Sequence, residues 1–309
     1  MDLTPATLRA LRTSFSKMFE DAYSQTTPFY SRLCTQVPST TAQNDYGWMA
    51  KLPGMREWLG ERVVHNLATH SYQLKNKDYE LTVGVDRNDI EDDNLGQYSM
   101  LFARMGESVS KHPDQLVKAL LVNGAANLCF DGLSYFNAAH PVNPYDAAKG
   151  TYSNYSSTGL ALTQANFLTA RATMATYKGE DGEPLGVVPN LLVVPPALEG
   201  MALRICKMGT IHTEDSSGES ASAPQNVTAG MADVLMLPEL AGADTTWYLL
   251  ATQSVIKPLV FQWRKRPVFV SKVSPTDDNV FHTKQFVYGA DGRYNAGYTL
   301  PFLAYKAVA

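Results

Sequence analysis

Apolar and polar residues alternate strictly from residue 79 to residue 85, where four apolar side chains are separated by a glutamate, a threonine and a glycine. This period of two predicts a strand with one buried face. A partner strand is expected to run up to Leu74 and to turn through residues 75–78, because Asn and Asp tolerate the backbone geometry of a tight turn. The pattern therefore predicts a long β-hairpin. Such a hairpin is marginal in water by itself, so it needs a neighbouring surface in this subunit or in another.

Apolar residues then recur every three or four positions, which predicts a helix of about eight turns over residues 95–124. The acidic run 89–94 suits the start of this helix, since negative charge offsets the positive end of the helix dipole. A divalent metal site is the less favoured interpretation of the run. Pro113 removes a backbone donor in mid-helix and Gly106 weakens the helix, so we expect a kink or restart at the proline and a hinge formed by the two residues.

The N-terminal segment combines an amphipathic helix with a polar tether. Thr4 is expected to cap the helix and Pro5 to be its first residue. The polar stretch 38–44 has little to bury and predicts a tether. We expect the apolar stripe of the helix to dock on a neighbouring subunit, with packing against its own domain as the alternative. The stripe consists of Leu8, Leu11, Phe15, Met18 and Phe19.

Strands and helices alternate from about residue 162, as a small mixed α/β domain requires. Residues 187–194 predict a short apolar strand that two prolines stop. The composition shifts to small and polar residues between 209 and 230, which predicts an exposed, mobile loop. The last third is rich in strands, and the glycine-rich segment 289–295 is expected to form the turn between the last two.

The chain has 309 residues, of which 45% are hydrophobic and 18% are charged, so it can bury a sizeable core in two expected subdomains. No apolar run reaches the roughly 18 residues of a membrane span, and no signal pattern is recognised at the start. We therefore expect no membrane contact and a cytoplasm-like compartment. The three cysteines are far apart, which favours buried free thiols over a disulfide framework or a zinc site.

A net charge of −4 argues against a dedicated nucleic-acid binder, because such proteins neutralise phosphates with clustered Lys and Arg. The one dense basic cluster, residues 264–266, follows Trp263 in a strand-like stretch. Ordinary strand charges are the favoured interpretation, and base stacking is the alternative. A weakly acidic protein can still form a container that holds DNA loosely.

The sequence contains few groups of residues that could form a catalytic site. Cys129, Asp131, Ser134 and His140 lie close together along the chain and could supply a Cys/His hydrolase. Residues so close along a chain rarely converge, and neither a Gly-x-Ser-x-Gly elbow nor a His-Glu-x-x-His helix occurs. We therefore expect no enzymatic activity, no catalytic residue, no metal and no cofactor, with a Cys/His hydrolase as a remote alternative.

Several ordered blocks resemble the Mu-like major head subunit family, the capsid proteins of Mu-type tailed phages and prophages. The blocks read NKDYELTVGVDRNDIEDDNLGQY from Asn76, MGESVSKHPDQLVKALLVNG from Met105 and CFDGLSYFNAAHP from Cys129. The blocks LLVVPPALEGMALRI and YGADGRYNAGYTLPFLAYKAV fit the same family. The resemblance covers the chain from Trp58 onward.

This resemblance implies an α+β fold, the tailed-phage major capsid fold, with an N-terminal arm, an extended β-hairpin loop, a peripheral domain with a long spine helix, and an axial domain at the capsomer centre. Carried onto this sequence, the segments are an arm at 1–47, an extended loop at 48–85, a peripheral domain at 86–161 with its spine helix at 95–124, an axial domain at 162–260 with the mobile loop 209–230, and strands returning to the peripheral domain at 261–309.

The function that the resemblance implies is a major capsid protein that assembles with itself into hexamers and pentamers of an icosahedral shell around the double-stranded DNA of a tailed phage. Scaffold and portal proteins, and a decoration protein, are the further partners considered, and DNA is enclosed without sequence-specific binding. The location is the virion, with the host cytoplasm during assembly. An encapsulin-like nanocompartment shell is the nearest alternative, ahead of a carbohydrate-binding surface protein.

Contacts between subunits are expected on both apolar extensions, with Gly106 and Pro113 as the hinge of the spine. The arm contributes the stripe named above. The extended loop contributes Trp58, Tyr72, Leu74, Tyr79, Leu81, Val83 and Val85.

Overall fold

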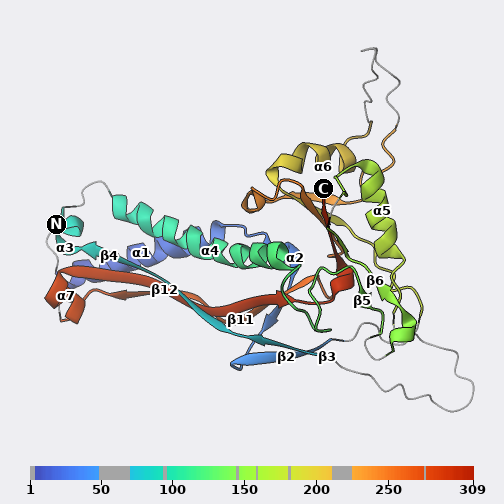
Figure 1. Cartoon of the computed structure of the whole chain (residues 1–309). Helices are drawn as coiled ribbons and strands as arrows, with labels where there is room; N and C mark the ends of the chain where they lie inside the picture. The colour runs from blue at the N-terminus through green and yellow to red at the C-terminus, as the bar shows by residue number, and fades with distance from the viewer. Residues whose placement is uncertain are drawn as a thin grey trace, which may run out of the picture.

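The computed structural model describes residues 4–48, 70–92, 96–143, 146–157, 159–179, 182–210, 225–274 and 276–309. Figure 1 shows an elongated body, in which two long helices run along a long sheet, and a second body at one end of it. The second body contains a five-stranded sheet and two further helices. Helices and strands are both present in each body, as expected for an α+β fold.

A four-stranded sheet in the order β1-β11-β12-β4 forms the elongated body. β11 (Leu259–Lys272) and β12 (Gln285–Tyr298) run antiparallel along its length, and α7 (Asp278–Thr283) lies between them in the chain. β4 (Lys77–Asp86) pairs antiparallel with β12, and β1 (Cys34–Pro38) pairs parallel with the first part of β11. The sheet therefore joins segments from the beginning, the first third and the end of the chain.

Two helices lie along this sheet (Figure 1), namely α1 (Pro5–Gln25) and α4 (Gln97–Asn123). Their apolar faces and β12 enclose a common core. Its centre is a cluster of three rings from Phe15, Phe102 and Tyr288, with centroid distances of 4.4, 4.6 and 5.6 Å. Contacts of this kind add to the apolar area that the helices bury.

The helix ends follow the sequence signals in part. Thr4 accepts a hydrogen bond from the Thr7 amide at 3.2 Å and Pro5 begins α1, as expected. The acidic run does not begin the long helix. It contributes to a separate short helix, α3 (Arg87–Glu91), which Asp86 caps, and α4 starts after Gly96, whose φ of 67° breaks the chain direction.

A five-stranded sheet in the order β7-β13-β10-β8-β9 forms the second body. β8 (Leu191–Val194) and β10 (Thr246–Leu250) are buried at every position, as central strands covered on both faces require. α5 (Gln164–Ala175) and α6 (Glu199–Cys206) share an apolar core with these strands. The remaining strands are β9 (Asp233–Met236), β13 (Ala304–Val308) and β7 (Tyr155–Ser156).

Short elements complete the described chain. They are α2 (Tyr30–Leu33), β2 (Gln43–Trp48), β3 (His70–Lys75), β5 (His140–Pro141), η1 (Ala147–Lys149), β6 (Thr151–Tyr152), η2 (Pro196–Leu198), η3 (Pro238–Leu240) and η4 (Pro301–Leu303).

The strand predicted at 79–85 exists, but the hairpin predicted around it is wrong. β4 pairs with β12, and β3 pairs with β2, so residues 70–86 continue from one strand into the next. Asn76, the expected turn residue, is buried between them. The alternating pattern indicates that one face of the strand is buried. It does not identify the pairing partner, which lies about two hundred residues away in the chain.

Two expectations for the last third are also wrong. Segment 289–295 lies inside β12 and makes no turn. Its glycines serve close packing, since a Cβ on Gly292 would lie 2.9 Å from the Tyr294 ring. The strands at 261–309 do not all return to the elongated body, because β13 joins the second body between β10 and β7.

Candidate functional site

A two-stranded ribbon of β2 and β3 shares no strand pairing with the four-stranded or the five-stranded sheet (Figure 1). Its strands pair antiparallel from Gln43 opposite Lys75 to Trp48 opposite His70. The connecting segment 49–69, which includes the predicted contact residue Trp58, lies outside the described residues. Tyr46 and Tyr72 pack against the core of the second body, and the Tyr46 hydroxyl donates to Gln262 Oε1 at 2.8 Å. Two strands alone are marginal in water, so the ribbon needs a further surface beyond this part.

Buried polar side chains hold the ribbon at its base. Asn76 is 3% exposed, and its amide nitrogen donates to Ser39 Oγ at 2.9 Å and to the Thr41 carbonyl at 2.8 Å. Gln262 of β11 is fully buried and donates to Asn76 Oδ1 at 2.6 Å and to the Leu74 carbonyl at 3.2 Å. Because a buried amide is costly to leave unpaired, this network fixes the point at which the ribbon leaves the sheet.

The described residues predicted for the extended loop do not share one outer surface. Leu74 and Val85 are each 5% exposed and belong to the interior of their own subunit, so the contact predicted for them is wrong. Val85 packs into the core beneath α1 and α4. Leu81 is the most exposed of the set at 36%. The partly buried members are Tyr72, Tyr79 and Val83.

The N-terminal helix packs against its own subunit, which corrects the expectation that its stripe docks on a neighbour. Leu8, Phe15 and Phe19 are 7%, 3% and 2% exposed in the core shared with α4. Gly106 makes this contact possible, because a Cβ at that position would lie 2.3 Å from the Phe19 carbonyl oxygen. The remaining members of the stripe are the partly buried Leu11 and the exposed Met18.

α4 runs through Pro113 without interruption, so the restart expected there is wrong. The next residue, Asp114, accepts a hydrogen bond from the Tyr30 amide at 2.8 Å and so satisfies the first free amide of α2. Burial raises the pKa of the Asp114 carboxyl to about 6. Pro113 and Gly106 therefore lie at contacts of α4 with the N-terminal helices, and their role as a hinge stays a prediction.

The C-terminal end of α4 is tied to both sheets. The Tyr298 hydroxyl donates to the Leu120 carbonyl at 2.8 Å, and Lys306 Nζ donates to the Val122 carbonyl at 3.2 Å. Lys306 is 8% exposed, and burial lowers its pKa. A cation at this helix end is favourable, and three aromatic rings face the ammonium at 5.8 Å. The rings are those of Phe136, Tyr155 and Tyr248.

The roles of Lys306 and of the buried amides at the base of the ribbon could not be recognised from the sequence. The one signal for Lys306 is a lysine in an otherwise apolar terminal strand. Asn76 and Gln262 carry no comparable signal, because an amide is common in both turns and exposed strands.

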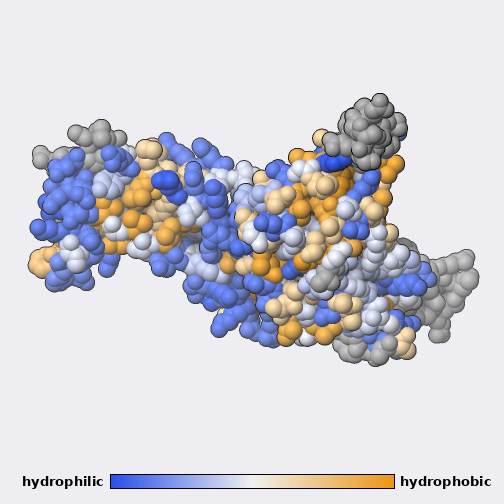
Figure 2. All heavy atoms as spheres, turned by 45° about the horizontal axis from the view of Figure 1, so that its top comes forward, coloured by the Kyte–Doolittle hydropathy of each residue, from blue (hydrophilic) through white to orange (hydrophobic). Residues whose placement is uncertain are grey.

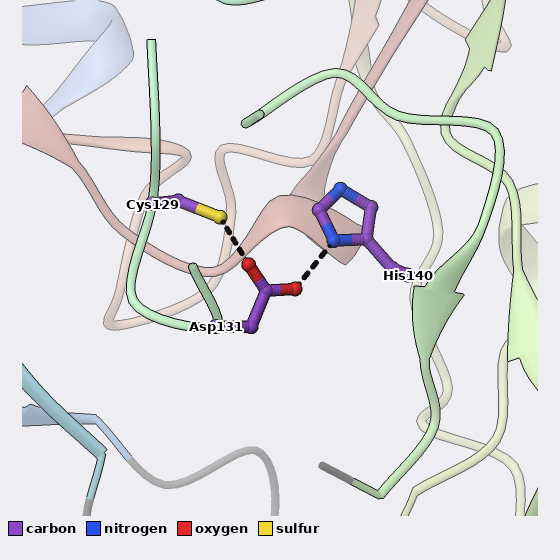
Figure 3. Close-up of side chains that lie close together, drawn as sticks. All are labelled: Cys129, Asp131 and His140. Carbon is purple, nitrogen blue, oxygen red and sulfur yellow. Dashed lines mark hydrogen bonds and ion pairs between the residues drawn. The ribbon is translucent and has the colours of Figure 1, made fainter. Parts of the chain in front are cut away.

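Cys129 and Asp131 from one loop converge with His140 of β5 (Figure 3), although their short spacing argued against it. The Cys129 thiol donates to Asp131 Oδ1 at 3.0 Å, and Nδ1 of His140 lies 2.6 Å from Asp131 Oδ2. His140 Nε2 lies 3.1 Å from the Tyr135 carbonyl, so both ring nitrogens face acceptors. Gly132, with φ of 80°, lets the loop turn back on itself.

This cluster is suited to holding a loop and not to attacking a substrate. His140 is fully buried and Cys129 is 6% exposed. Burial, and next the hydrogen bond to Asp131, raise the pKa of the Cys129 thiol far above its ordinary value, which disfavours the thiolate that nucleophilic catalysis needs. Burial by itself raises the pKa of Asp131, but the hydrogen bonds from His140 and Cys129 outweigh it and hold that pKa below its usual value.

The same three side chains are the one group of at least three metal-ligand residues within the described ranges, with ligand atoms within 4.8 Å of one another. Structural zinc usually takes four protein ligands, and no fourth side chain of the described residues joins this group. Each of the three already has a hydrogen-bond partner. The arrangement therefore fits a hydrogen-bonded group that stabilises the loop better than it fits a metal site.

Apolar side chains reach the surface of both bodies (Figure 2). Met100 on α4 is 70% exposed, and Leu101 beside it is 37% exposed. On the second body, Met208 and Val227 are 55% and 66% exposed. Such side chains offer area for contacts with other chains. No helix in the described ranges is long and apolar enough to cross a membrane.

Comparison with known proteins gives consistent matches over the whole chain. The profile of the family described as Mu-like prophage major head subunit gpT matches residues 8–160, 155–240 and 238–309. The major capsid protein of Escherichia phage Mu is 30% identical over 298 residues, which are 96% of this chain and 72% of that protein.

Solved capsid structures show the same arrangement. A chain in the procapsid of bacteriophage JBD30 is 34% identical, with a TM-score of 0.60 over 99% of this chain and 76% of that one. A chain in the JBD30 capsid decorated with minor capsid protein trimers is 31% identical, with a TM-score of 0.52 over 77% of this chain and 99% of that one.

Proposed function

We propose a route of shell assembly for this chain. The chain belongs to the Mu-like prophage major head subunit family and is a capsid shell protein of a tailed phage. As a member of a family of structural capsid proteins, it is a component of the virion and assembles with itself; it is not an enzyme. In the proposed arrangement, hexamers and pentamers of this one chain tile an icosahedral shell around double-stranded DNA. Assembly takes place in the host cytoplasm.

The ribbon of β2 and β3 is the observation that carries this proposal. It is firmly rooted by Asn76 and Gln262, yet it has only two strands of its own. A rooted ribbon of this kind gains stability when it lies across a neighbouring subunit. We infer that the ribbon, including Trp58 at its connecting segment, forms the extended loop that clamps one subunit to the next.

Several contacts of this kind hold a subunit more firmly than any one of them, because breaking one contact leaves the others at high effective concentration. A typical specific interface buries roughly 1,600 Å² in total. At about 25 cal/mol per Å² of apolar area this is a large gross term, from which the cost of association is subtracted. Each contact can therefore stay weak enough for assembly errors to be reversed.

We assign the N-terminal helix a role within its own subunit, in contrast to the ribbon. Its buried stripe belongs to the elongated body, so the arm supports the spine helix of its own subunit. Met18, 41% exposed on this helix, and Leu81 on β4 remain as apolar side chains that a neighbour can cover. We assign the elongated body to the peripheral domain and the second body to the axial domain at the capsomer centre.

Partners beyond the chain itself follow from the proposed function. We propose scaffold and portal proteins as further partners of the shell. The relative from JBD30 is part of a capsid decorated with minor capsid protein trimers, and we propose that a decoration protein can bind this shell too.

Replacing residues 49–69 with an Asn-Gly turn tests the clamp. The turn closes β2 and β3 into a short hairpin, so the subunit should fold normally but form no shells in negative-stain images or sedimentation. Val255→Asp is the control, because Val255 is 93% exposed in a loop before β11 and a charge there should leave shells intact. Normal shells from the shortened chain would show that segment 49–69 is not part of the clamp, which would then be confined to β2 and β3.

A further inference from the structure

Residues 264–266, two arginines flanking a lysine, are all exposed in the middle of β11. In a regular strand, successive side chains alternate between the two faces, so three in a row would not share one environment. Register shifts on both sides of Lys265 interrupt the pairing with β12. Irregularities of this kind re-aim side chains, and here they present three positive charges to solvent together.

A groove opens next to these residues, where the edge strand β1 stops. β1 pairs with β11 as far as Pro38 opposite Trp263, and β11 continues beyond it. The step leaves a space of about 320 Å³. Its lining residues are Gln36, Val37, Pro38, Trp263, Arg264 and Arg266.

The two arginines keep their charge uncompensated. Lys265 forms an ion pair with Asp291 on β12, which removes that carboxylate from the arginines. No carboxylate of the described residues forms an ion pair with Arg264 or Arg266. The guanidinium of Arg266 instead lies 4.8 Å above the centre of the Trp263 ring, which fixes its position at the groove.

We propose that this groove binds phosphate groups of the nucleic-acid backbone that the shell encloses, an inference that rests on the proposed function. Guanidinium groups match phosphate oxygens with paired hydrogen bonds. Trp263 is 8% exposed and Arg266 covers it, so no free ring face remains for a base to stack on. Binding is therefore independent of base sequence, in contrast to the base-stacking alternative raised by the sequence.

The strength of such a site suits a container that is filled and later emptied. Two arginines neutralise at most two phosphates, which gives a slope of about −1.8 for log K against log salt concentration on duplex DNA. Contacts of this size are weak for one subunit and add up over the many copies in a shell. The net charge of −4 disfavours tight binding of DNA by the rest of the subunit.

The double variant Arg264→Gln/Arg266→Gln tests the groove. Unassembled full-length subunits are titrated with a short duplex DNA over a series of salt concentrations, and shell formation without DNA is followed in parallel. The matched control is Arg9→Gln/Arg12→Gln, which removes the same charge from exposed positions of α1. We expect the groove variant alone to lose most of the salt-dependent binding, with its slope reduced by about 1.8, and to form shells normally.

Three results would overturn the proposal. Equal loss of binding in both double variants would show that only net charge matters. Unchanged DNA binding in the groove variant would exclude the groove as a phosphate site. Failure of that variant to form shells, with DNA binding retained, would assign the arginines to carboxylates of a second copy. Failure of the unmodified chain to form shells would instead count against the proposed function, and is read separately.

Discussion

Gly106→Ala separates two roles for the glycine in the spine helix. If Gly106 serves as a hinge, alanine should stiffen α4 and stabilise the subunit by about 1 kcal/mol, the difference in helix propensity. If Gly106 serves the contact with α1, alanine should destabilise the subunit, because its Cβ would lie 2.3 Å from the Phe19 carbonyl oxygen. The two interpretations predict opposite signs.

The structure favours the second sign. The same Cβ would lie 3.1 Å from the Tyr23 amide nitrogen, so the obstacle is the backbone of α1 and not a flexible side chain. Relief requires α1 to move by about 1 Å, which loosens its packing against Phe102. Overpacking of this kind costs about 1–3 kcal/mol. Full detachment of α1 would expose Leu8, Phe15 and Phe19, at about 1.5–3 kcal/mol for each side chain, which sets the upper limit.

The assay is urea unfolding of the unassembled full-length chain, followed by far-ultraviolet circular dichroism. Gly200→Ala is the matched control, since Gly200 lies in α6 and a Cβ there meets nothing within 4 Å. We expect a lower unfolding midpoint for Gly106→Ala and an unchanged or higher one for Gly200→Ala. A Gly106→Ala subunit as stable as the unmodified chain would refute the close-contact argument.

Two further substitutions test buried carboxylates. The folded-state pKa of Asp114, about 6, lies above its unfolded value of about 3.9, so its protonation stabilises the fold at low pH and this contribution is lost as the pH rises through 6. Asp114→Asn keeps an acceptor for the Tyr30 amide. In urea unfolding, its free energy of unfolding should exceed that of the unmodified chain by about 1–3 kcal/mol at pH 7 and should equal it at pH 4. The same difference between the two chains at both pH values would contradict this. Asp131→Asn replaces one of the two acceptor oxygens, which serve His140 and Cys129, with an NH2 donor, so one buried partner is left unpaired and stability should fall by about 1–3 kcal/mol. Cys129→Ser should be nearly neutral. Similar unfolding midpoints for the two variants would show that Asp131 does not hold the loop together.

The helices could be predicted from the sequence because their signals are local. The periodic apolar residues of α4 lie within one segment, and its observed range, Gln97–Asn123, is within two residues of the predicted one. The cap and first residue of α1 were correct for the same reason. The family resemblance from the ordered blocks was likewise confirmed.

Strand partners could not be predicted, because pairing depends on contacts between distant segments. The alternation at 79–85 is equally compatible with a hairpin and with the observed pairing to β12. The glycines of segment 289–295 gave a turn signal, although their function is close packing inside a strand. The docking of α1 on α4 depends on Gly106. The need for a glycine at this position can be recognised only when the positions of both helices are known.

Part of the candidate site was visible in the sequence and part was not. The hydrogen-bonded group that stabilises the loop consists of Cys129, Asp131 and His140. These residues were identified in the sequence, but their spacing suggested that they stay apart. The glycine turn that brings them together becomes informative only with its backbone angle. Lys306 was missed because a buried cation is rare, and only the end of α4 and the surrounding rings explain it.

The position of these contacts indicates where the shell subunit can adapt. Tyr298 and Lys306 fasten the end of α4 to both sheets, and the close contact at Gly106 fastens its middle to α1. A bend at either place would break packed or hydrogen-bonded contacts. The ribbon has its fixed base at Asn76 but only two strands beyond it, so its free energy of local opening should be lower than that of the four-stranded and five-stranded sheets. Differences between the environments of hexamers and pentamers are therefore expected to be absorbed by the ribbon, while the two bodies move as rigid units.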